Sequence, residues 1–446
     1  MRTHPRILLA LCLGCGNPDA PTPEPAPAAQ IPTPSVDQPQ PTHPPPFKPP
    51  PTAGPKGSGA AMQDPTGFPP FHDWDAPPGA SITAKGRWSA PVQLTAKPGG
   101  GYRPQVAVAK DGTIHALYYE RTDNGDLIRH RRSTDGVTWT EPLHLGHHDN
   151  RNWGPDLVAR DDGSVVVVYD YALPDFRSRG FIVRFDGQTW SSPEAISPDN
   201  GGEVGSGHVA HGEADTLAYV FTGKQLGPQH RFRAFYRWFK DGSWGEIGQF
   251  TDGVQDAWHT NVERRPDGSM LAGWDVGQGG AETQLYVVAS EDGTWGKPEN
   301  ISATSKPGER VHFAFGPDRV DHLTWFHKVA GRPIHIYTRS GRPGAWGPTA
   351  EPSRGYGGFH FDPDIAVNSR GVLVLVWGWD SGSRAEMVYS VNHGDGWSPP
   401  ALLAEIGAGK PGLASIDVTQ DDRFVVVWNQ GVRGYNEVYA ATLEVN

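Results

Sequence analysis

The chain has 446 residues, and its 39 Lys and Arg against 50 Asp and Glu give a formal net charge of −11 at pH 7. This acidic balance disfavours a nucleic-acid partner, because nucleic acids bind basic surfaces. The two cysteines, Cys12 and Cys15, both lie in the first fifteen residues. The rest of the chain therefore has no disulfide and no cysteine-ligated metal. We expect neither a metal site nor a cofactor, and a metal held by histidines together with Asp156, Asp362 or Asp364 is the alternative.

Residues 1–15 have the pattern of an export signal. Two arginines precede the apolar run 7–13, which is followed by Gly14 and Cys15. A charged start, a short apolar core and a small residue at the cleavage site describe a secretory signal, too short to span a membrane in the mature protein. The Gly14-Cys15 pair resembles the bacterial lipobox. This resemblance implies a lipid on Cys15 and anchoring at the outer membrane or cell surface. Plain secretion is the alternative.

Residues 16–80 form a Pro-rich tract, with runs such as Pro44–Pro46 and Pro49–Pro51. Such a composition has too few apolar side chains to offset the entropy of ordering, and the prolines keep the chain extended. We expect a disordered, semi-rigid linker that holds the following domain away from the membrane.

From residue 81 to residue 446, seven tryptophans recur at a near-constant spacing. They are Trp88, Trp139, Trp190, Trp244, Trp295, Trp346 and Trp397, so the intervals are 51, 51, 54, 51, 51 and 51 residues. Each full interval holds four short strand patterns, and four of the tryptophans close a turn that contains Asp-Gly, as in Ser133–Trp139. A repeat near 50 residues built from four strands is typical of a β-propeller blade. The sequence thus predicts an all-β domain over 81–446.

Corresponding strand openings indicate the number of blades. They fall at Pro104, Pro155, Gly207, Thr260, Val311, Pro363 and Ala414, and an aromatic residue follows each by fourteen positions, which predicts packing between blades. The seventh unit has three strands, whereas residues 82–95 have a fourth-strand pattern without partners. We expect that segment to complete the last blade, because otherwise an edge would stay unpaired. The prediction is a seven-bladed β-propeller whose last blade is closed by the N-terminal strand.

The turn Asp135-Gly136-Val137-Thr138-Trp139 resembles the Asp-box of the sialidase-like (BNR-repeat) propellers. The resemblance covers residues 81–446. It implies a structural role for these turns, in which the Asp side chain bonds turn amides and the Trp packs between sheets. The catalytic domain of sialidases has six blades, one fewer than this sequence predicts.

Polar residues flank the strand openings, where the repeat is broken. Those just before the openings are Arg103, Gly154, Ser206, His259, Arg310, Asp362 and Leu413, and those just after are Gln105, Asp156, His208, Asn261, His312, Asp364 and Ser415. Side chains two apart on a strand share a face, so we expect both sets to converge on the central channel. The candidate ligand-binding residues are Arg103, Asp156, His208, His259, Arg310, His312, Asp362 and Asp364, with Trp153 and Trp258 on the rim. The alternative is a channel mouth filled with hydrogen-bonded water.

The first of three candidate functions is a cell-surface lipoprotein, expected to be a monomer, that binds an acidic glycan or another polar ligand at the central pocket. Near-uniform repeats favour it, because they leave little room for the lids that usually enclose an enzyme's site. A non-catalytic scaffold for protein interactions is the most conservative alternative.

An enzyme is the remaining alternative. Tyr102-Arg103-Pro104 resembles the Phe/Tyr-Arg-Ile-Pro motif of sialidases, which implies that Arg103 would bind a sugar carboxylate, with Arg310 as a second arm. Tyr356 and Glu120 are formal candidates for the nucleophile and its activating group. A polysaccharide lyase would instead use a histidine such as His208, His259 or His312 as its base, beside an arginine that neutralises a uronate carboxylate.

Overall fold

Antiparallel strands make up the regular structure of the computed structural model. It describes residues 80–95, 100–122, 125–147, 152–173, 177–197, 203–224, 231–251, 255–277, 283–302, 308–327, 334–405, 409–432 and 435–445, and every regular element among them is a strand. The predicted signal over 1–15, its Cys15, and the predicted linker up to residue 79 lie outside the described residues.

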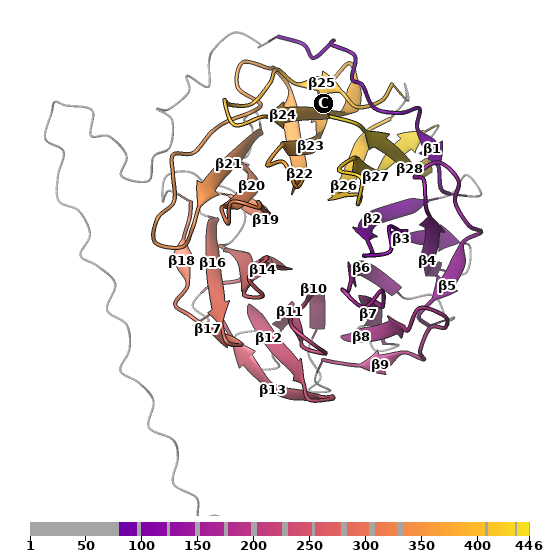
Figure 1. The fold of residues 1–446 in the computed structure, drawn as a ribbon, viewed down its shortest axis with the longest axis vertical. Coiled ribbons are helices and arrows are strands. Elements are labelled where there is room, and N and C mark those ends of the chain that lie inside the picture. Colours follow the sequence, from indigo (N-terminus) through magenta and orange to yellow (C-terminus); the bar gives the residue numbers. More distant parts are fainter. Residues whose placement is uncertain are drawn as a thin grey trace, which may run out of the picture. The chain divides into compact units, whose positions relative to one another are not determined.

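The strands form seven antiparallel sheets arranged as blades around a central channel (Figure 1). The first blade holds β2 (Gly101–Val108), β3 (Ile114–Thr122), β4 (Gly125–Ser133) and β5 (Leu143–Leu145), and the second holds β6 (Asn152–Ala159), β7 (Val165–Ala172), β8 (Ser178–Phe185) and β9 (Glu194–Ala195). The third holds β10 (Glu203–His211), β11 (Leu217–Lys224), β12 (Phe232–Lys240) and β13 (Ser243–Gln249), and the fourth holds β14 (Ala257–Arg264), β15 (Met270–Val276), β16 (Gln284–Glu291), β17 (Thr294–Trp295) and β18 (Glu299–Asn300). The fifth holds β19 (Glu309–Phe315), β20 (Asp321–His327) and β21 (His335–Gly341), and the sixth holds β22 (Phe359–Val367), β23 (Leu373–Asp380), β24 (Ala385–Asn392) and β25 (Ala401–Leu402). The seventh holds β26 (Pro411–Val418), β27 (Phe424–Val432), β28 (Tyr435–Leu443) and β1 (Val92–Gln93).

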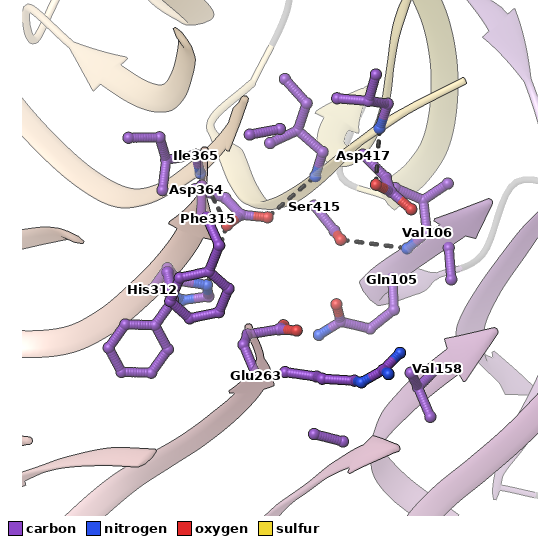
Figure 2. Close-up of a pocket in the computed structure, with 18 of the residues that line it drawn as sticks. Gln105, Val106, Val158, Glu263, His312, Phe315, Asp364, Ile365, Ser415 and Asp417 are labelled. Atoms are coloured by element: carbon purple, nitrogen blue, oxygen red, sulfur yellow. Dashed lines mark hydrogen bonds and ion pairs between the residues drawn. The ribbon is translucent and has the colours of Figure 1, made fainter. Parts of the chain in front are cut away.

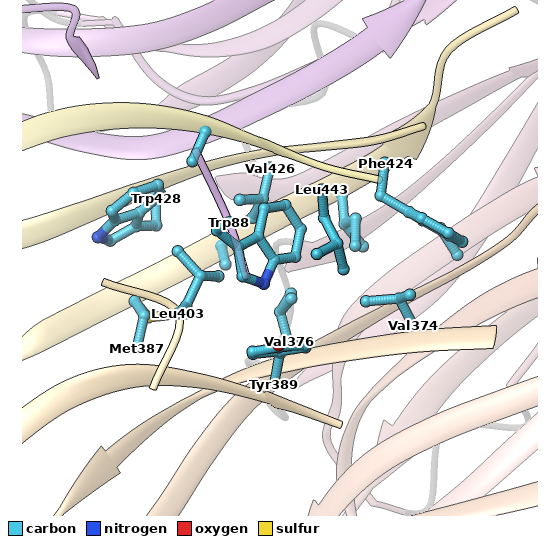
Figure 3. Packing of buried hydrophobic residues seen from close by; sticks show 14 of the residues in the cluster. Trp88, Val374, Val376, Met387, Tyr389, Leu403, Phe424, Val426, Trp428 and Leu443 are labelled. Atoms are coloured by element: carbon cyan, nitrogen blue, oxygen red, sulfur yellow. The ribbon is translucent and has the colours of Figure 1, made fainter. Parts of the chain in front are cut away.

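The N-terminal strand closes the ring, as predicted. In β1, Val92 pairs with Ala440 and Gln93 with Tyr439 of β28. The segment before it runs along the outer edge of the sixth and seventh blades (Figure 1), where Lys85 makes a bridge to Leu402. This short pairing is reinforced by packing, because the Trp88 side chain lies among the buried residues between these two blades (Figure 3).

The second strand of each blade supplies most of the core. All eight residues of β23 are buried, as are seven of eight in β7, which is the expected pattern for strands covered on both faces. The aromatic residue predicted to pack between blades is at most 2% exposed in every blade: Tyr118, Tyr169, Phe221, Trp274, Trp325, Trp377 and Trp428. Large rings at these positions fill the wedge between neighbouring sheets, so that prediction is confirmed.

The Asp-Gly turns are of two kinds. The carboxylate of Asp135 accepts hydrogen bonds from the amides of Val137 (2.8 Å) and Thr138 (2.7 Å), and Asp186 bonds its own turn in the same way. Asp241 and Asp292 differ, because each has a positive φ, as does the glycine after it, within a two-residue hairpin turn. The prediction of side-chain-bonded turns is therefore right for the first pair and wrong for the second.

Each innermost strand carries an irregularity at the strand opening, and this feature positions the candidate site. The register of pairing with the second strand shifts there in all seven blades, for example between Tyr102 and Gln105 in β2. A bulge of this kind bends the strand and re-aims its side chains. The residues before and after each opening therefore face the channel in two tiers. The bulge directs them there, whereas the sequence suggested the regular alternation of a strand.

Candidate functional site

The channel mouth contains a small cavity that gathers many of the predicted residues. Its volume is about 70 Å³, and it is lined by Arg103, Gln105, Gly154, Pro155, Ser206, His208, His259, Thr260, Asn261, Arg310, Val311, His312 and Leu413. Below it lies a cavity of about 390 Å³, lined by all seven residues that follow the strand openings (Figure 2). Those seven residues therefore form a ring between the two, which we call the middle ring: Gln105, Asp156, His208, Asn261, His312, Asp364 and Ser415.

The middle ring links neighbouring blades through side-chain-to-backbone hydrogen bonds. The Asp156 carboxylate accepts from the amide of Val209 (2.9 Å), and the Asp364 carboxylate accepts from the amide of Ile416 (3.0 Å). Ser415 accepts in the same way from Val106 (3.2 Å), as Figure 2 shows. Asp156 and Asp364 thus have a structural role at the place where the sequence predicted ligand contacts.

The two ring histidines lie beside these carboxylates. His208 Nδ1 is 3.4 Å from Asp156 Oδ2, and His312 Nδ1 is 3.2 Å from Asp364 Oδ1. Because both histidines line the upper and the lower cavity, they separate the two spaces and can offer their other ring nitrogen to a ligand.

Above the middle ring, six residues adopt left-handed backbone conformations, and we call them the upper tier. Their φ angles are 45° at Arg103, 56° at Gly154, 50° at Ser206, 44° at His259, 55° at Arg310 and 49° at Asp362. A side chain in this region costs roughly 1–3 kcal/mol, and glycine avoids the cost. Only one of the six is glycine. The other five carry polar side chains in spite of this strain, which points to a function.

Two basic side chains of the upper tier already have carboxylate partners. His259 Nδ1 is 2.9 Å from Asp275 Oδ1, and Arg310 Nη1 is 2.7 Å from Asp362 Oδ1. Asp275 is buried behind the histidine, with 2% of its side chain exposed. Arg310, which the sequence suggested as a second arm for a ligand carboxylate, is therefore partly neutralised by Asp362.

Arg103 differs from both. It is half-buried in the cavity wall, and its guanidinium makes no hydrogen bond or ion pair with any residue that the structure describes. The buried carboxyl of Asp170 lies on the other side of Gly154 and interacts electrostatically with the Arg103 charge. The mouth thus presents one uncommitted guanidinium, Arg103, together with two basic side chains that have carboxylate partners.

Asp170 and Asp275 were missed from the sequence, although they share one position. Each follows the core aromatic residue of its second strand, Tyr169 or Trp274. A carboxylate next to a buried ring, in an otherwise apolar strand, was the available signal. Burial raises the pKa of Asp170 to about 8, against the opposing effects of Arg103 and of the nearby backbone amides.

The lower cavity contains two further acidic residues that the sequence reading passed over. Glu263 and Asp417 occupy a tier otherwise made of Ala and Val, two residues below the middle ring (Figure 2). Burial raises the pKa of Asp417 to about 6, although its carboxylate accepts hydrogen bonds from the amides of Val108 and Val418. Desolvation by the channel walls and repulsion from nearby carboxylates raise the pKa of Glu263 well above its usual range. Because the Glu263 side chain is exposed to the channel, it is only partly desolvated. Repulsion from the nearby carboxylates therefore contributes much of the rise in its pKa.

Neither Trp258 of the predicted rim nor the formal catalytic pair joins the cavity. Trp258 packs against Phe232, with ring centroids 4.2 Å apart, and lines neither cavity. The side chain of Trp153 lies outside the described part of the chain. Glu120 is paired with Arg129 at 2.8 Å, and Tyr356 packs against the core between the fifth and sixth blades. A sialidase-type nucleophile is therefore not assembled from Tyr356 and Glu120.

Two further features are absent from the described residues. No group of three or more His, Cys, Asp or Glu side chains among them is arranged to hold a metal ion. Nor does this part of the chain contain a helix long and apolar enough to cross a membrane.

No family model and no curated protein matches this chain in sequence. Solved structures do match its fold. A protein of unknown function from Dyadobacter fermentans aligns with a TM-score of 0.54 and 16% identity, over 81% of this chain and 99% of that one. A PL25 polysaccharide lyase, an ulvan lyase bound to -[GlcA(1-4)Rha3S]-, aligns with a TM-score of 0.53 and 11% identity, over 80% and 98%. The Hadza microbial sialidase Hz136 aligns with a TM-score of 0.47 and 15% identity, over 77% and 66%. The first two alignments establish a shared fold, and identities this low bring no activity to this chain.

Proposed function

We propose that the channel mouth binds an acidic saccharide, with the carboxylate of the ligand on Arg103. The observation that carries this proposal is the uncommitted Arg103 guanidinium, held in a strained conformation in the cavity wall. An arginine fork matches a carboxylate in geometry and charge, and such charge-assisted hydrogen bonds are the strong ones. His259 and Arg310 line the same cavity and place further hydrogen-bonding groups beside Arg103.

The size of the cavity supports the binding of an acidic group rather than a whole sugar. Its volume is only about 70 Å³. A carboxylate fits this space, and the sugar ring would then remain at the mouth. The side chains of Gln105, Ser206 and Asn261 line the cavity beside the cations and supply the neutral donors and acceptors that hydroxyl groups require.

The test is binding to a panel of sialylated and uronate-containing glycans, compared with their neutral counterparts. Wild type is expected to bind acidic members only. Arg103→Gln should weaken binding about 10- to 100-fold, the effect of losing a charged hydrogen-bonding partner. Arg342→Gln, an exposed arginine outside both cavities, is the matched control and should bind as wild type does. Equal binding by Arg103→Gln and wild type, or equal binding of neutral glycans, would refute the proposal.

A second function, cleavage of the bound saccharide, is favoured by the pair formed by His259 and Asp275. Donation of Nδ1–H to Asp275 leaves Nε2 of His259 as an acceptor on the opposite side of the ring. For a uronate held on Arg103, Nε2 could take the proton from the carbon next to the carboxylate. The electron pair would then form a carbon–carbon double bond as the glycosidic C–O bond breaks, and the leaving oxygen would take up a proton.

The lyase reaction is tested by the ultraviolet absorbance of the unsaturated product, with uronate polymers as substrates. Activity in wild type and its loss in His259→Gln would support cleavage. If wild type binds the polymer but forms no unsaturated product, the protein binds uronates without cleaving them, and the lyase function is excluded. A fluorogenic sialoside, assayed in parallel, reports hydrolysis instead.

We also propose that the protein is exported and lipid-anchored through Cys15, on the strength of the lipobox-like Gly14-Cys15 pair. A surface location would bring the channel mouth to extracellular glycans. Incorporation of a labelled fatty acid into wild type, and none into Cys15→Ser, is the expected result. Equal labelling of the two proteins would contradict this proposal.

A further inference from the structure

Asp170 occupies an unusual position for a carboxyl group. It lies in the apolar strand β7, directly after the core residue Tyr169, and 0% of its surface is exposed. Neither of its carboxylate oxygens has a hydrogen-bond partner among the residues that the structure describes. A buried carboxylate that is neither paired nor hydrogen-bonded is costly, and it usually avoids the cost by taking up a proton.

The groups that face Asp170 come from three other strands. They are the Arg103 guanidinium from β2, the phenol of Tyr219 from β11, and the backbone amides of Ser206 and Gly207 from β10. Burial, and then the Asp170 carboxylate, raise the pKa of Tyr219 well above its usual range, so the phenol stays neutral. Arg103 is therefore the one full charge among these neighbours.

Gly154 forms the window between Asp170 and Arg103. A Cβ atom at this position would lie 3.0 Å from Asp170 Oδ2 and 3.5 Å from Arg103 Nη1. Both groups thus contact the same point of the β6 backbone, from the core side and from the cavity side. A side chain at residue 154 would intrude between them, and the φ of 56° would strain it as well.

The equivalent carboxylate in the fourth blade shows what is missing in the second. Asp275 holds His259, the upper-tier residue of its own blade, at 2.9 Å. In the second blade the upper-tier residue is Gly154, which offers no side chain, so Asp170 depends on Arg103 from the neighbouring blade. Arg103 therefore stands between two possible anions, the buried Asp170 and a ligand in the cavity.

We propose that Asp170 is a positioning residue that couples acidic-ligand binding at Arg103 to the uptake of a proton. This inference rests on the proposed function, because it concerns the same arginine. When Asp170 is protonated, the charge of Arg103 is available to the ligand. When Asp170 is ionised, it competes for that charge, and ligand binding must be accompanied by protonation of the carboxylate.

The pH window follows from the geometry and the ionisation of Asp170. Its pKa of about 8 means that the carboxyl is mostly neutral at pH 7 and mostly ionised at pH 9. The ligand carboxylate and the arginine keep their charges over this range. The affinity of wild type should therefore be constant below pH 8 and fall by up to about tenfold per pH unit above it.

The experiment is calorimetric titration of the full protein with D-glucuronate and N-acetylneuraminate, at pH 7 and pH 9. Two buffers of different ionisation enthalpy at each pH give the number of protons taken up. We expect an uptake approaching one proton at pH 9 in wild type and none in Asp170→Asn. The variant should also bind more tightly than wild type at pH 9, by up to about tenfold. Asp395→Asn, an exposed control, should behave as wild type does.

The possible outcomes separate this inference from the proposed function. Binding with equal proton uptake in wild type and Asp170→Asn overturns the inference and leaves the binding site standing. An affinity of wild type that is the same at pH 7 and pH 9 does so too, even if the variant fails to fold. Absence of binding by wild type at both pH values overturns the proposed function, and the inference falls with it.

Discussion

Replacement of Trp88 by alanine tests how the ring is closed. This residue lies beside the N-terminal strand, only 9% exposed, and its indole meets the ring of Tyr389 edge-on, with centroids 5.7 Å apart (Figure 3). Trp88 packs against residues of both the sixth and the seventh blade, such as Val376 and Trp428. Since β1 itself has only two residues, the buried side chains of this segment, with Trp88 the largest, should contribute much of the closing energy.

The magnitude follows from two opposing effects. A buried Trp→Ala change costs about 3–5 kcal/mol, through lost transfer energy and the cavity left behind. The indole N–H of Trp88 is buried and has no partner among the described residues, so its removal returns about 1 kcal/mol or somewhat more. We expect a net loss of about 2–4 kcal/mol for Trp88→Ala. Trp88→Phe keeps an aromatic ring, removes the same N–H, and should lie within about 1.5 kcal/mol of wild type.

Equilibrium urea unfolding measures this loss, with Val137→Ala as the control because that apolar side chain is 53% exposed. The control should change the free energy of unfolding by less than about 0.5 kcal/mol. If Trp88→Ala lies within the range of the control, with an unchanged dependence on urea, the N-terminal segment does not stabilise the ring. The account of blade closure would then be wrong.

Three further predictions concern single carboxylates. Asp170 holds a proton in the folded state that it loses on unfolding. As the pH rises from about 4 to about 8, this proton makes the free energy of unfolding fall by about 1.4 kcal/mol per pH unit. Urea titrations of Asp170→Asn at several pH values should lack this component. Asp364→Ala leaves the amide of Ile416, between two blades, without its acceptor. Calorimetry should show a loss of about 1–3 kcal/mol in the free energy of unfolding. An unchanged stability would show that this hydrogen bond does not stabilise the ring. The turn amides hold the pKa of Asp135 at about 2, so its stabilisation is present above about pH 4 and is lost as the pH falls toward 2. Acid unfolding of Asp135→Asn should accordingly show a weaker pH dependence than wild type, and an identical profile would rule out this role for the turn.

The architecture could be predicted from the sequence because its signals are periodic. The repeated tryptophans and the aromatic residue of each second strand mark the blades, and the unpartnered pattern around Trp88 indicates the closing strand. The two kinds of Asp-Gly turn could also have been separated. Asp135-Gly136 precedes its tryptophan by two intervening residues, whereas Asp241-Gly242 precedes Trp244 by one, which is too short for the side-chain-bonded turn.

The candidate site was predictable only in part. The convergence of polar residues on the channel followed from their place in the repeat, but the left-handed conformation at Arg103 or His259 leaves no glycine signal to read. The pairing of His259 with Asp275 and the place of Asp170 near Arg103 were equally hidden, because Asp170 and Asp275 lie on second strands that read as core. Partners brought together from different strands depend on the bulges and on the closure of the ring, which no local pattern encodes.

The most direct test of the central claim is a crystal structure of the protein with an acidic oligosaccharide selected from the binding panel. We predict a ligand carboxylate within hydrogen-bond distance of the Arg103 guanidinium, in the small cavity above the middle ring. A ligand bound elsewhere, or bound at the mouth with its carboxylate turned away from Arg103, would contradict the proposed function.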